Sequence, residues 1–536
     1  MLQAIVDFEM ALFTAQVNTA ARATETPSVV EEKMKSQRKR ILTLLLGLLS
    51  VGAICLLVEE QHTPLRSALA FGEDGVFSGA GDDDDNDDGG ADDTCKTHKA
   101  LLKAALAKSL HDDADDDAIH RGRKNFDDRK LHLLRANGRA CADCHMANDN
   151  FQLSPASAKA RFDALMACRA TKPDADDPLF RPIDADDFRT NGAAASDFRN
   201  VTENGLIRIT FPLPSTLKLV DDATGQVTSE THVDVWRSVP SVFNVKLTGP
   251  DPAPLPGTEW PRGPNVNGGY QLDARVTTLQ EQALGALINH AQIQRAPPQR
   301  FLDELTAFQN QLFSSDSIRA ASAAIDQGEP PPDPDPPLDA LETHGKAVFD
   351  RACAQCHGSV GQSNPAAVGK VRYVPIRTQC PRPVDGPNLP GWQGTPRFVF
   401  KPCAPRLLRN ARTYEITRSN GKIARQRTSD PGRTLLTGFA ALAVGPPPLA
   451  GAGRDDWLAL DTPMLRNISQ TAPYFHNNSA DTLEEVLDHY DAFFKLVIVN
   501  LQPGPRPPVI STDGVAIDRP FTAAERAALL AYLRKL

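Results

Sequence analysis

The sequence predicts a mainly α-helical protein with small β additions, organised as two similar domains in tandem. The first observation is the pattern C-x-x-C-H, which occurs as CADCH at 141–145 and as CAQCH at 353–357. The second is the stretch before each copy, GRKNFDD (122–128) and GKAVFDR (345–351), which share a G-x-x-x-F-D core. A helix start and a motif that repeat together indicate a duplicated domain.

Length and composition limit the class of protein. A chain of 536 residues is long enough for two to four domains with sizeable cores. Charged residues make up 23% of the chain and the formal net charge is −9. This balance suits a soluble protein with basic partners and argues against nucleic-acid binding.

The segment 34–70 is typical of exported proteins. A basic run, MKSQRKR, begins at Met34, and the apolar stretch ILTLLLGLLSVGAICLLV follows it at 41–58. Such a stretch is either the hydrophobic part of a signal peptide or a membrane anchor. We favour cleavage because SALA (67–70) is a small-residue cleavage site. Both alternatives imply export to the periplasm, with membrane attachment only if 41–58 is retained.

Residues 1–33 precede this expected signal. Their segment IVDFEMALFTAQ (5–16) shares an F-x-x-x-L-F core with LTAFQNQLFSSD (305–316). Either an amphipathic helix is duplicated, or translation starts at Met34 and 1–33 is a spurious extension. We prefer the second interpretation, which N-terminal sequencing of the mature protein would test.

Two segments have the composition of linkers. Residues 71–120 include GEDGVFSGAGDDDDNDDGGADD (72–93), which has almost nothing to bury and predicts an acidic disordered linker. Residues 328–337, GEPPPDPDPP, predict an extended, semi-rigid linker. The second linker divides the remaining chain into 121–327 and 338–536, each with one C-x-x-C-H copy.

Local patterns predict a few elements within these two domains. The C-terminal stretch 521–536 begins with a capping box of Thr522 and Glu525 and continues as an amphipathic helix. The stretch LIRITFPL (206–213) alternates as a half-buried strand does.

Each C-x-x-C-H copy has the signature of covalent c-type haem attachment. The two thiols add to haem vinyl groups and the histidine coordinates the iron. The alternatives are a redox dithiol and half of a zinc site. A redox dithiol needs no histidine, and a zinc ribbon would need a further C-x-x-C. We therefore predict two haem c groups. The attaching cysteines are Cys141, Cys144, Cys353 and Cys356, and the iron ligands are His145 and His357.

Five of the nine cysteines lie outside these motifs. Export into an oxidising compartment permits disulfides. The candidate pairs are Cys95 with Cys168 and Cys380 with Cys403.

The C-terminal region resembles a known family. The stretch DTPMLRNISQTAPYFHNNSADTLEEVLDHY (461–490) closely resembles the T-P-x-L-R-N…T-A-P-Y-F-H-x-x-x-x-x-T-L-E-E-V block of bacterial di-haem cytochrome c peroxidases and of MauG, a related enzyme that oxidises tryptophan residues of a partner protein. RSVPSVFNV (237–245) and LDARVTTLQEQALGALINHAQ (272–292) resemble further stretches of that family. The resemblance covers about residues 120–536 and implies two cytochrome c-like haem domains.

The resemblance assigns a role to Tyr490. By itself, TLEEVLDHYDAFF (482–494) is an amphipathic helix with Tyr490 on its apolar side. Fourteen positions after the histidine matched by His476, the family places the distal ligand of the second haem, a methionine in peroxidases and a tyrosine in MauG. The resemblance implies that Tyr490 is this ligand. Met464 is a competing thioether, but the family does not use its position, so we interpret it as packing near the haem edge. A phenolate would lower the potential of this haem relative to methionine.

The resemblance places the chemistry at the first haem, where this sequence departs from the family. The distal glutamine is retained as Gln282, but the distal glutamate is matched by Gln292. A glutamate there would supply acid–base catalysis worth ~10²–10⁴ in rate, whereas a glutamine does not titrate. His290 is the nearby side chain that can take over, and a structural role for it is an equal alternative. Leu272 matches the tryptophan between the haems.

Two further sites are implied. His232 lies near the position of a displaceable histidine that some peroxidases use as sixth ligand of the first haem, although the ungapped match is Glu230 and MauG-type members leave the position open. The family also binds calcium, for which the carbonyls of Thr471 and Pro473 would be donors, but the family's asparagine is matched by Ser238.

These inferences predict a periplasmic peroxidase. It would take electrons from a small c-type cytochrome or a cupredoxin at the second haem and reduce hydrogen peroxide at the first. The first alternative is a MauG-like oxidase or haem oxygenase that uses peroxide or dioxygen on an organic or protein substrate. The second alternative is a non-catalytic di-haem electron carrier.

Overall fold

The computed structural model of the chain describes residues 95–107, 117–131, 134–187, 197–248, 270–273, 275–276, 278–357, 373–375, 405–418, 421–438, 457–461, 463–500 and 521–536. Residues 1–33, the expected signal or anchor (34–70), the tract 72–93 and the candidate pair Cys380 and Cys403 lie outside these stretches. Among the helices that are described, none combines the length and hydrophobicity needed to cross a bilayer.

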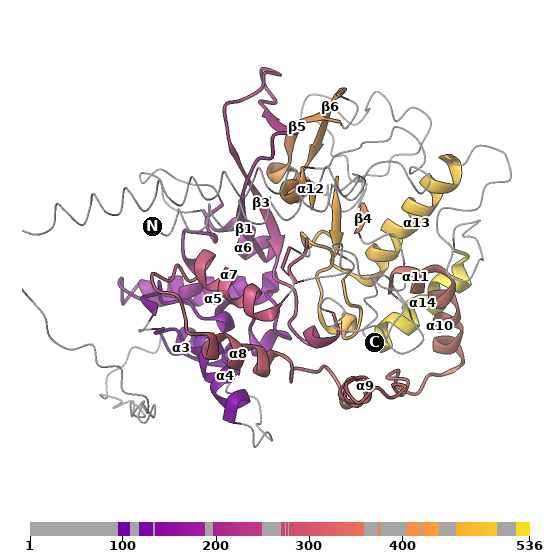
Figure 1. Ribbon diagram of the computed structural model, residues 1–536, viewed down its shortest axis with the longest axis horizontal. Coiled ribbons are helices and arrows are strands. Elements are labelled where there is room, and N and C mark those ends of the chain that lie inside the picture. Colours follow the sequence, from indigo (N-terminus) through magenta and orange to yellow (C-terminus); the bar gives the residue numbers. More distant parts are fainter. Residues whose placement is uncertain are drawn as a thin grey trace, which may run out of the picture. The chain divides into compact units, whose positions relative to one another are not determined.

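Helices dominate the described residues (Figure 1). Several begin at a hydroxyl that accepts a hydrogen bond from a backbone N–H of the first turn, as at Ser154, Thr278 and Ser315. The capping box predicted from Thr522 and Glu525 is confirmed at the start of α14. The α-helices are α3 (Lys96–Ala104), α4 (Asp117–Asp127), α5 (Pro155–Arg169), α6 (Arg199–Asn204), α7 (Leu279–Asn289), α8 (Gln299–Gln309), α9 (Asp316–Asp326), α10 (Ala340–Ala352), α11 (Ala354–His357), α12 (Thr434–Thr437), α13 (Leu483–Asn500) and α14 (Ala523–Lys535). Short 3-10 helices are η4 (Cys141–Asp143), η5 (Ala147–Asp149), η6 (Pro178–Phe180), η7 (Val245–Leu247), η9 (Pro405–Asn410) and η10 (Ile468–Gln470).

Short strands add small antiparallel sheets. The strands are β1 (Leu206–Pro212), β2 (Leu217–Val220), β3 (His232–Ser238), β4 (Tyr373–Pro375), β5 (Arg412–Thr417), β6 (Ile423–Thr428) and β7 (Ala459–Asp461). β1 pairs with β3, β2 with β5, β5 with β6, and β4 with β7. The strand predicted at 206–213 is confirmed as β1. A helix-rich chain with small sheets agrees with the mainly α class predicted from the sequence.

The repeated G-x-x-x-F-D core packs a helix pair in each half of the chain. A methyl group on Gly122 of α4 would lie 1.9 Å from the carbonyl oxygen of Glu304 in α8, and one on Gly345 of α10 would lie 2.0 Å from that of Ala528 in α14. Figure 1 shows α10 and α14 side by side. One turn later, the buried phenylalanine of each repeat contacts an aromatic ring of the partner helix. The ring centroids are 5.3 Å apart for Phe126 with Phe308 and 5.4 Å apart for Phe349 with Tyr532. The repeat is therefore a duplicated helix-packing unit.

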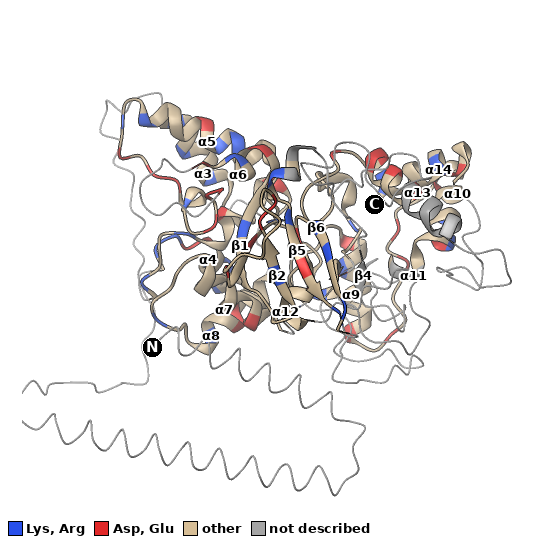
Figure 2. Cartoon of the chain, turned by 90° about the horizontal axis from the view of Figure 1, so that it is seen from above, with Lys and Arg blue, Asp and Glu red and all other residues tan. Residues whose placement is uncertain are grey.

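The two halves of the chain share a sheet. β2 comes before the proline-rich segment and β5 and β6 come after it, yet β2 pairs with β5 (Figure 2). In this pairing Leu219 is opposite Tyr414. Asn200 and Asn410 also donate to each other's amide oxygens, at 3.2 and 2.8 Å. Residues Gly90–Leu536 accordingly form one compact unit.

The proline-rich segment 328–337 is anchored to the helices that follow it. Residues 329–337 have neither helix nor strand. The carboxylate of Asp335 in this segment is almost fully buried. This carboxylate pairs with Lys346 and Arg466 and accepts a hydrogen bond of 2.9 Å from the Tyr532 hydroxyl. The segment thus has a fixed attachment point near its C-terminal end.

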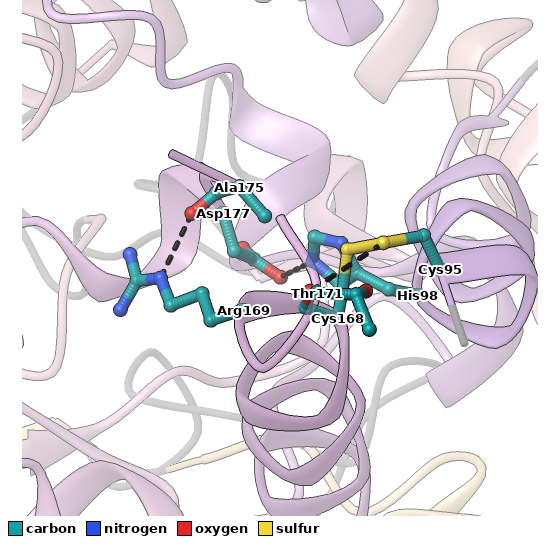
Figure 3. The surroundings of a disulfide bond; sticks show 7 residues. All are labelled: Cys95, His98, Cys168, Arg169, Thr171, Ala175 and Asp177. Atoms are coloured by element: carbon teal, nitrogen blue, oxygen red, sulfur yellow. Dashed lines mark hydrogen bonds and ion pairs between the residues drawn. A yellow bond between two sulfur atoms is a disulfide. The ribbon is translucent and has the colours of Figure 1, made fainter. Parts of the chain in front are cut away.

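One part of the expected linker 71–120 is helical, which corrects that prediction. α3 occupies Lys96–Ala104, and α4 starts at Asp117. The predicted disulfide between Cys95 and Cys168 is confirmed, and it ties the start of α3 to α5 (Figure 3). This cross-link and the buried ring of His98 provide the tertiary contacts that the aspartate-rich composition of the segment does not suggest.

Candidate functional site

The first C-x-x-C-H copy forms a partly buried loop. Cys141 lies in η4, Cys144 follows it, and both thiols are outside disulfides. Mainly because the thiols are buried, their pKa values are raised to about 12, so both are protonated at neutral pH. Two neighbouring thiols that stay unlinked suit covalent attachment to a haem.

His145 has the tautomer that an iron ligand requires. Its Nδ1 is 3.0 Å from the carbonyl oxygen of Phe151. Because a carbonyl only accepts, Nδ1 carries the hydrogen and Nε2 keeps its lone pair. Burial lowers the pKa of His145, which keeps the ring neutral.

A buried carboxylate inside the motif holds the loop. Asp143 is fully buried, and its Oδ1 accepts from Arg129 Nε at 2.9 Å while its Oδ2 accepts from the backbone N–H of Ala140 at 2.9 Å. Arg161 of α5 donates both to the Asp143 carboxylate, at 3.2 Å, and to its carbonyl oxygen, at 2.9 Å. The loop that presents the thiols is therefore fixed by two arginines.

The same network continues to His98, which lies beside the disulfide and contacts Asp177 (Figure 3). Arg161 also binds Asp177, whose carboxylate is 3.1 Å from Nε2 of the buried His98 on α3. Burial opposes ionisation of Asp177, but the hydrogen bond from His98 and the charge of Arg161 prevail and lower its pKa to about 2. The Cys95–Cys168 cross-link holds α3, and hence His98, in this position.

His290 lies beside the same loop. The Asn137 side chain donates to the His290 carbonyl oxygen at 2.9 Å, and the Asn137 backbone N–H donates to that of Ala291 at 2.9 Å. The His290 ring contacts the carboxylate of Asp184, with 2.7 Å between Nδ1 and Oδ2. A charge on His290 would lower the pKa of His145, so the two imidazoles are within electrostatic range.

The two predicted distal glutamines are placed differently. Gln282 is half-buried within α7. Gln292 is exposed, has a φ of +53°, and its Oε1 accepts a hydrogen bond of 3.0 Å from Asn137. Gln292 therefore contacts Asn137, beside the attachment loop, at the protein surface. The side chain of His290 is less exposed than that of Gln292.

The second C-x-x-C-H copy follows α10 directly. Cys353 is the partly buried residue at the end of α10, Cys356 lies in α11, and His357 is buried at the end of α11. The backbone N–H of His357 donates to the carbonyl oxygen of Cys353 at 2.9 Å, which closes the turn.

Tyr490 lies in the predicted helix. α13 starts at Leu483, and the apolar stripe of Leu483, Val486 and Leu487 is buried. Tyr490 is half-buried, and its ring is 5.7 Å from that of His489. The helix and its apolar face are confirmed, while ligation by Tyr490 stays a prediction. Met464, the competing ligand, is also half-buried.

A buried charge cluster that the sequence does not reveal joins distant segments. Arg237 at the end of β3 binds Asp430 and Asp273, with a distance of 2.7 Å from Nε to Asp430, and Arg275 binds Asp273 at 2.8 Å. Asp273 directly follows Leu272, whose carbonyl oxygen accepts a hydrogen bond of 2.9 Å from the backbone N–H of Asp461. No spacing in the sequence signals this cluster, because Arg237 and Asp430 are 193 positions apart.

His476 lies next to this cluster. Its ring is buried, and among the described residues neither ring nitrogen has a hydrogen-bond partner. Burial, with Arg237 nearby, lowers the pKa of His476 to about 4 even though Asp430 opposes the shift. A buried imidazole without partners is costly, so this ring suits a polar group beyond those that the described residues provide.

The remaining predicted positions lie in separate places. His232 is exposed at the start of β3, where its ring contacts the Thr231 hydroxyl at 2.9 Å. Thr471 and Pro473 are half-buried ahead of His476. The backbone N–H of Ser238 donates to the His476 carbonyl oxygen at 2.7 Å. Within the described stretches, no three His, Cys, Asp or Glu side chains form a cluster that would hold a metal ion.

Comparisons with known proteins give structural neighbours. No family model and no curated protein matches the chain. A MauG-like protein associated with microbial copper homeostasis is 18% identical, with 80% of this chain and 91% of that chain covered and a TM-score of 0.34. The diheme peroxidase BthA from Burkholderia thailandensis is 17% identical, with 80% and 88% covered and a TM-score of 0.36. A hydrazine synthase from Kuenenia stuttgartiensis is 14% identical, with 82% and 92% covered and a TM-score of 0.31. With TM-scores below 0.5, these similarities do not by themselves establish a function.

Proposed function

We propose that this chain is a di-haem c-type oxidoreductase of the cytochrome c peroxidase and MauG family that reduces hydrogen peroxide. Electrons would come from a small c-type cytochrome or a cupredoxin in the periplasm. The observation that carries the proposal is the first attachment loop, where His145 presents Nε2 and the titratable His290 lies beside the same loop. The motif at 461–490 supports the family.

The residues present fit the two haem groups. At the first site, Cys141 and Cys144 would attach the group and His145 would coordinate its iron, and the thiols and the ring are in the protonation states that this requires. At the second site, Cys353 and Cys356 would attach the group, and His357 and Tyr490 would coordinate its iron. The buried ring of His476, which has no hydrogen-bond partner among the residues that the structure describes, is further support, because an added polar group would satisfy it. When bound, haem supplies a redox-active iron with an exchangeable coordination position.

The side chains at the first site can handle the protons of the reaction. Peroxide reduction needs a group that takes a proton from one peroxide oxygen and delivers it to the other. Gln292 cannot titrate and is exposed. His290 can hold a proton at Nε2, because its Nδ1 is engaged by Asp184. His290 therefore replaces the missing glutamate as the acid–base group.

A steady-state assay with hydrogen peroxide and a reduced small cytochrome c tests this function. We expect turnover by the haem-loaded protein well above that of free haem, and a loss of roughly 10²-fold in His290→Gln. Asp163→Asn, a change at an exposed ion pair on α5, is the control. A wild-type rate no better than that of free haem would rule out the peroxidase.

Tyr490 favours a second candidate, a MauG-like oxidase or haem oxygenase acting on an organic or protein substrate. In the family resemblance, tyrosine at this position belongs to MauG and methionine to the peroxidases. A peroxide-dependent mass increase in a tryptophan-containing protein substrate, without any reduced cytochrome c, is the expected signature. A protein substrate that is recovered unmodified would exclude a MauG-like oxidation of that substrate.

A further inference from the structure

Asp184 is held rigidly in the first half of the chain. Its carboxylate is almost fully buried, and both of its oxygens are 2.6 Å from Nη1 of Arg139, which is equally buried. The other nitrogens of Arg139 are also engaged. Nε donates to the carbonyl oxygen of Pro178 at 2.9 Å and Nη2 to that of Leu179 at 2.8 Å. The guanidinium and the carboxylate therefore have little freedom to move.

The ionised state of Asp184 determines which nitrogen of His290 carries the hydrogen. Burial alone would raise the pKa of Asp184, but attraction to Arg139 and the hydrogen bond with His290 outweigh it and hold the pKa below its ordinary value. An ionised carboxylate only accepts, so Nδ1 of His290, at 2.7 Å, is the donor. Neutral His290 then has its lone pair on Nε2.

The same arginine also fixes His290 relative to the attachment loop. Arg139 is two residues before Cys141, and its Nη1 is 3.3 Å from the carbonyl oxygen of His290. Asn137, two residues earlier, donates to that carbonyl oxygen as well. The stretch that leads into the thiols therefore holds the backbone of His290 directly and its ring through Asp184.

We propose that Asp184, clamped by Arg139, is a positioning residue that orients His290 and leaves Nε2 as the proton acceptor at the first haem. The proposal deepens the proposed function and rests on it. Asp184 thereby prepares His290 to act in place of the glutamate that is missing at position 292. Among the described residues, Asp184 contacts the His290 ring, Arg139 contacts its carbonyl oxygen, and His145 lies within electrostatic range.

Cyanide binding to the ferric, haem-loaded protein tests the proposal without relying on peroxidase turnover. Hydrogen cyanide must lose its proton before the anion can bind a ferric haem, and His290 Nε2 would accept that proton. The association rate is measured from the Soret change after mixing with potassium cyanide between pH 5 and 9. We expect Asp184→Asn and His290→Gln to slow association near neutral pH by roughly 10²-fold each. The double variant should be no slower than either single one.

Two further variants provide the controls. Asp176→Asn removes an exposed carboxylate paired with Arg181 and should keep the wild-type pH profile. Because Asp184→Asn leaves Arg139 buried without its partner and can impair folding, Arg139→Gln with Asp184→Asn removes both charges and should show the same slow association.

The outcomes separate this proposal from the proposed function. Association as fast in both Asp184 variants as in the wild type, with His290→Gln slow, would overturn the positioning role and leave the peroxidase intact. Slow association in the Asp184 variants, in a protein that fails to turn over peroxide, would support the positioning role and reject the peroxidase. Effects of Asp184→Asn and His290→Gln that multiply in the double variant would also contradict the proposal, because they would act independently.

Discussion

Gly122 lies so close to Glu304 that a methyl group on its Cα would be 1.9 Å from the Glu304 carbonyl oxygen. Gly345 stands in the same relation to Ala528, at 2.0 Å. Each glycine therefore lets two helices approach backbone to backbone, and each belongs to the duplicated G-x-x-x-F-D core. The repeat has the same spacing in both halves of the chain because its glycine allows the same close helix packing in each.

Alanine at either glycine should destabilise the protein. Gly122→Ala and Gly345→Ala insert a methyl group against rigid backbone, and we expect each to cost about 1–3 kcal/mol of the free energy of unfolding. Gly285 of α7 has open space around it, so Gly285→Ala should stabilise by about 0.5–1 kcal/mol through helix propensity. Urea denaturation measures all three. Equal stabilities of Gly122→Ala and Gly285→Ala would contradict the packing role.

Loss of the buried carboxylate of Asp143 should destabilise the first attachment loop. Asp143→Asn leaves Arg129 without its carboxylate and removes one of the two carboxylates that Arg161 binds, the other being Asp177, so we expect a cost of about 1–3 kcal/mol in the free energy of unfolding. The second motif has Gln355 at this position, so the chemistry of attachment itself needs no acid there. Urea denaturation and covalent haem content per chain are the measurements. The exposed change Asp163→Asn should alter stability by less than about 1 kcal/mol.

The pKa of Asp177 predicts a loss of stability in acid. Its pKa falls from 3.8 to about 2 on folding, so its charged form is stabilised in the folded protein. A carboxyl with a depressed folded pKa adds stability above its unfolded pKa and loses it as the pH falls through its folded value. The contribution, about 2 kcal/mol, should be complete above pH 5 and disappear towards pH 2. Urea denaturation from pH 5 to pH 2 should show a shallower decline in Asp177→Asn. A decline as steep as in the wild type would refute the assignment.

Replacement of Tyr490 tests ligation of the second haem. Tyr490→Phe removes the phenolate, so the spectrum of one haem should change and its reduction potential should rise, because a hard anionic ligand favours the ferric state. Tyr474→Phe is the matched control, since the Tyr474 hydroxyl donates to the Ile468 carbonyl oxygen at 3.1 Å. Electron paramagnetic resonance and potentiometric titration are the measurements. Two haems unchanged in Tyr490→Phe would show that the ligand assignment is wrong.

Local signals in the sequence were sufficient for several features. The strand at 206–213 alternates in burial, and the capping box of Thr522 and Glu525 is a pattern of adjacent residues, so both could be predicted. The pair Cys95 and Cys168 could be proposed because few cysteines lie outside the two motifs. These features depend on residue type and short spacing.

Other features depend on residues that meet only after folding. Arg139 and Asp184 are 45 positions apart, and the chain has many arginines and aspartates, so the sequence does not say which of them pair. The acidic composition of 71–120 predicted a linker, but α3 forms within it. The helix is held by the disulfide between Cys95 and Cys168, which are 73 positions apart and meet only after folding. The match in sequence placed Gln292 at the distal side of the first haem, but a sequence match does not say whether a side chain is exposed, as Gln292 is in the structure.

The sheet that contains β2 and β5 has a consequence for how this protein can be divided. A cut within 328–337 would separate β2 from β5 and β6, and would leave an unpaired strand edge on each piece. Neither piece would be a self-sufficient module, despite the duplication of its haem motif and its helix pair. Two fragments produced together should instead recombine, as in split-protein complementation, by restoring the strand pairing of Leu219 with Tyr414.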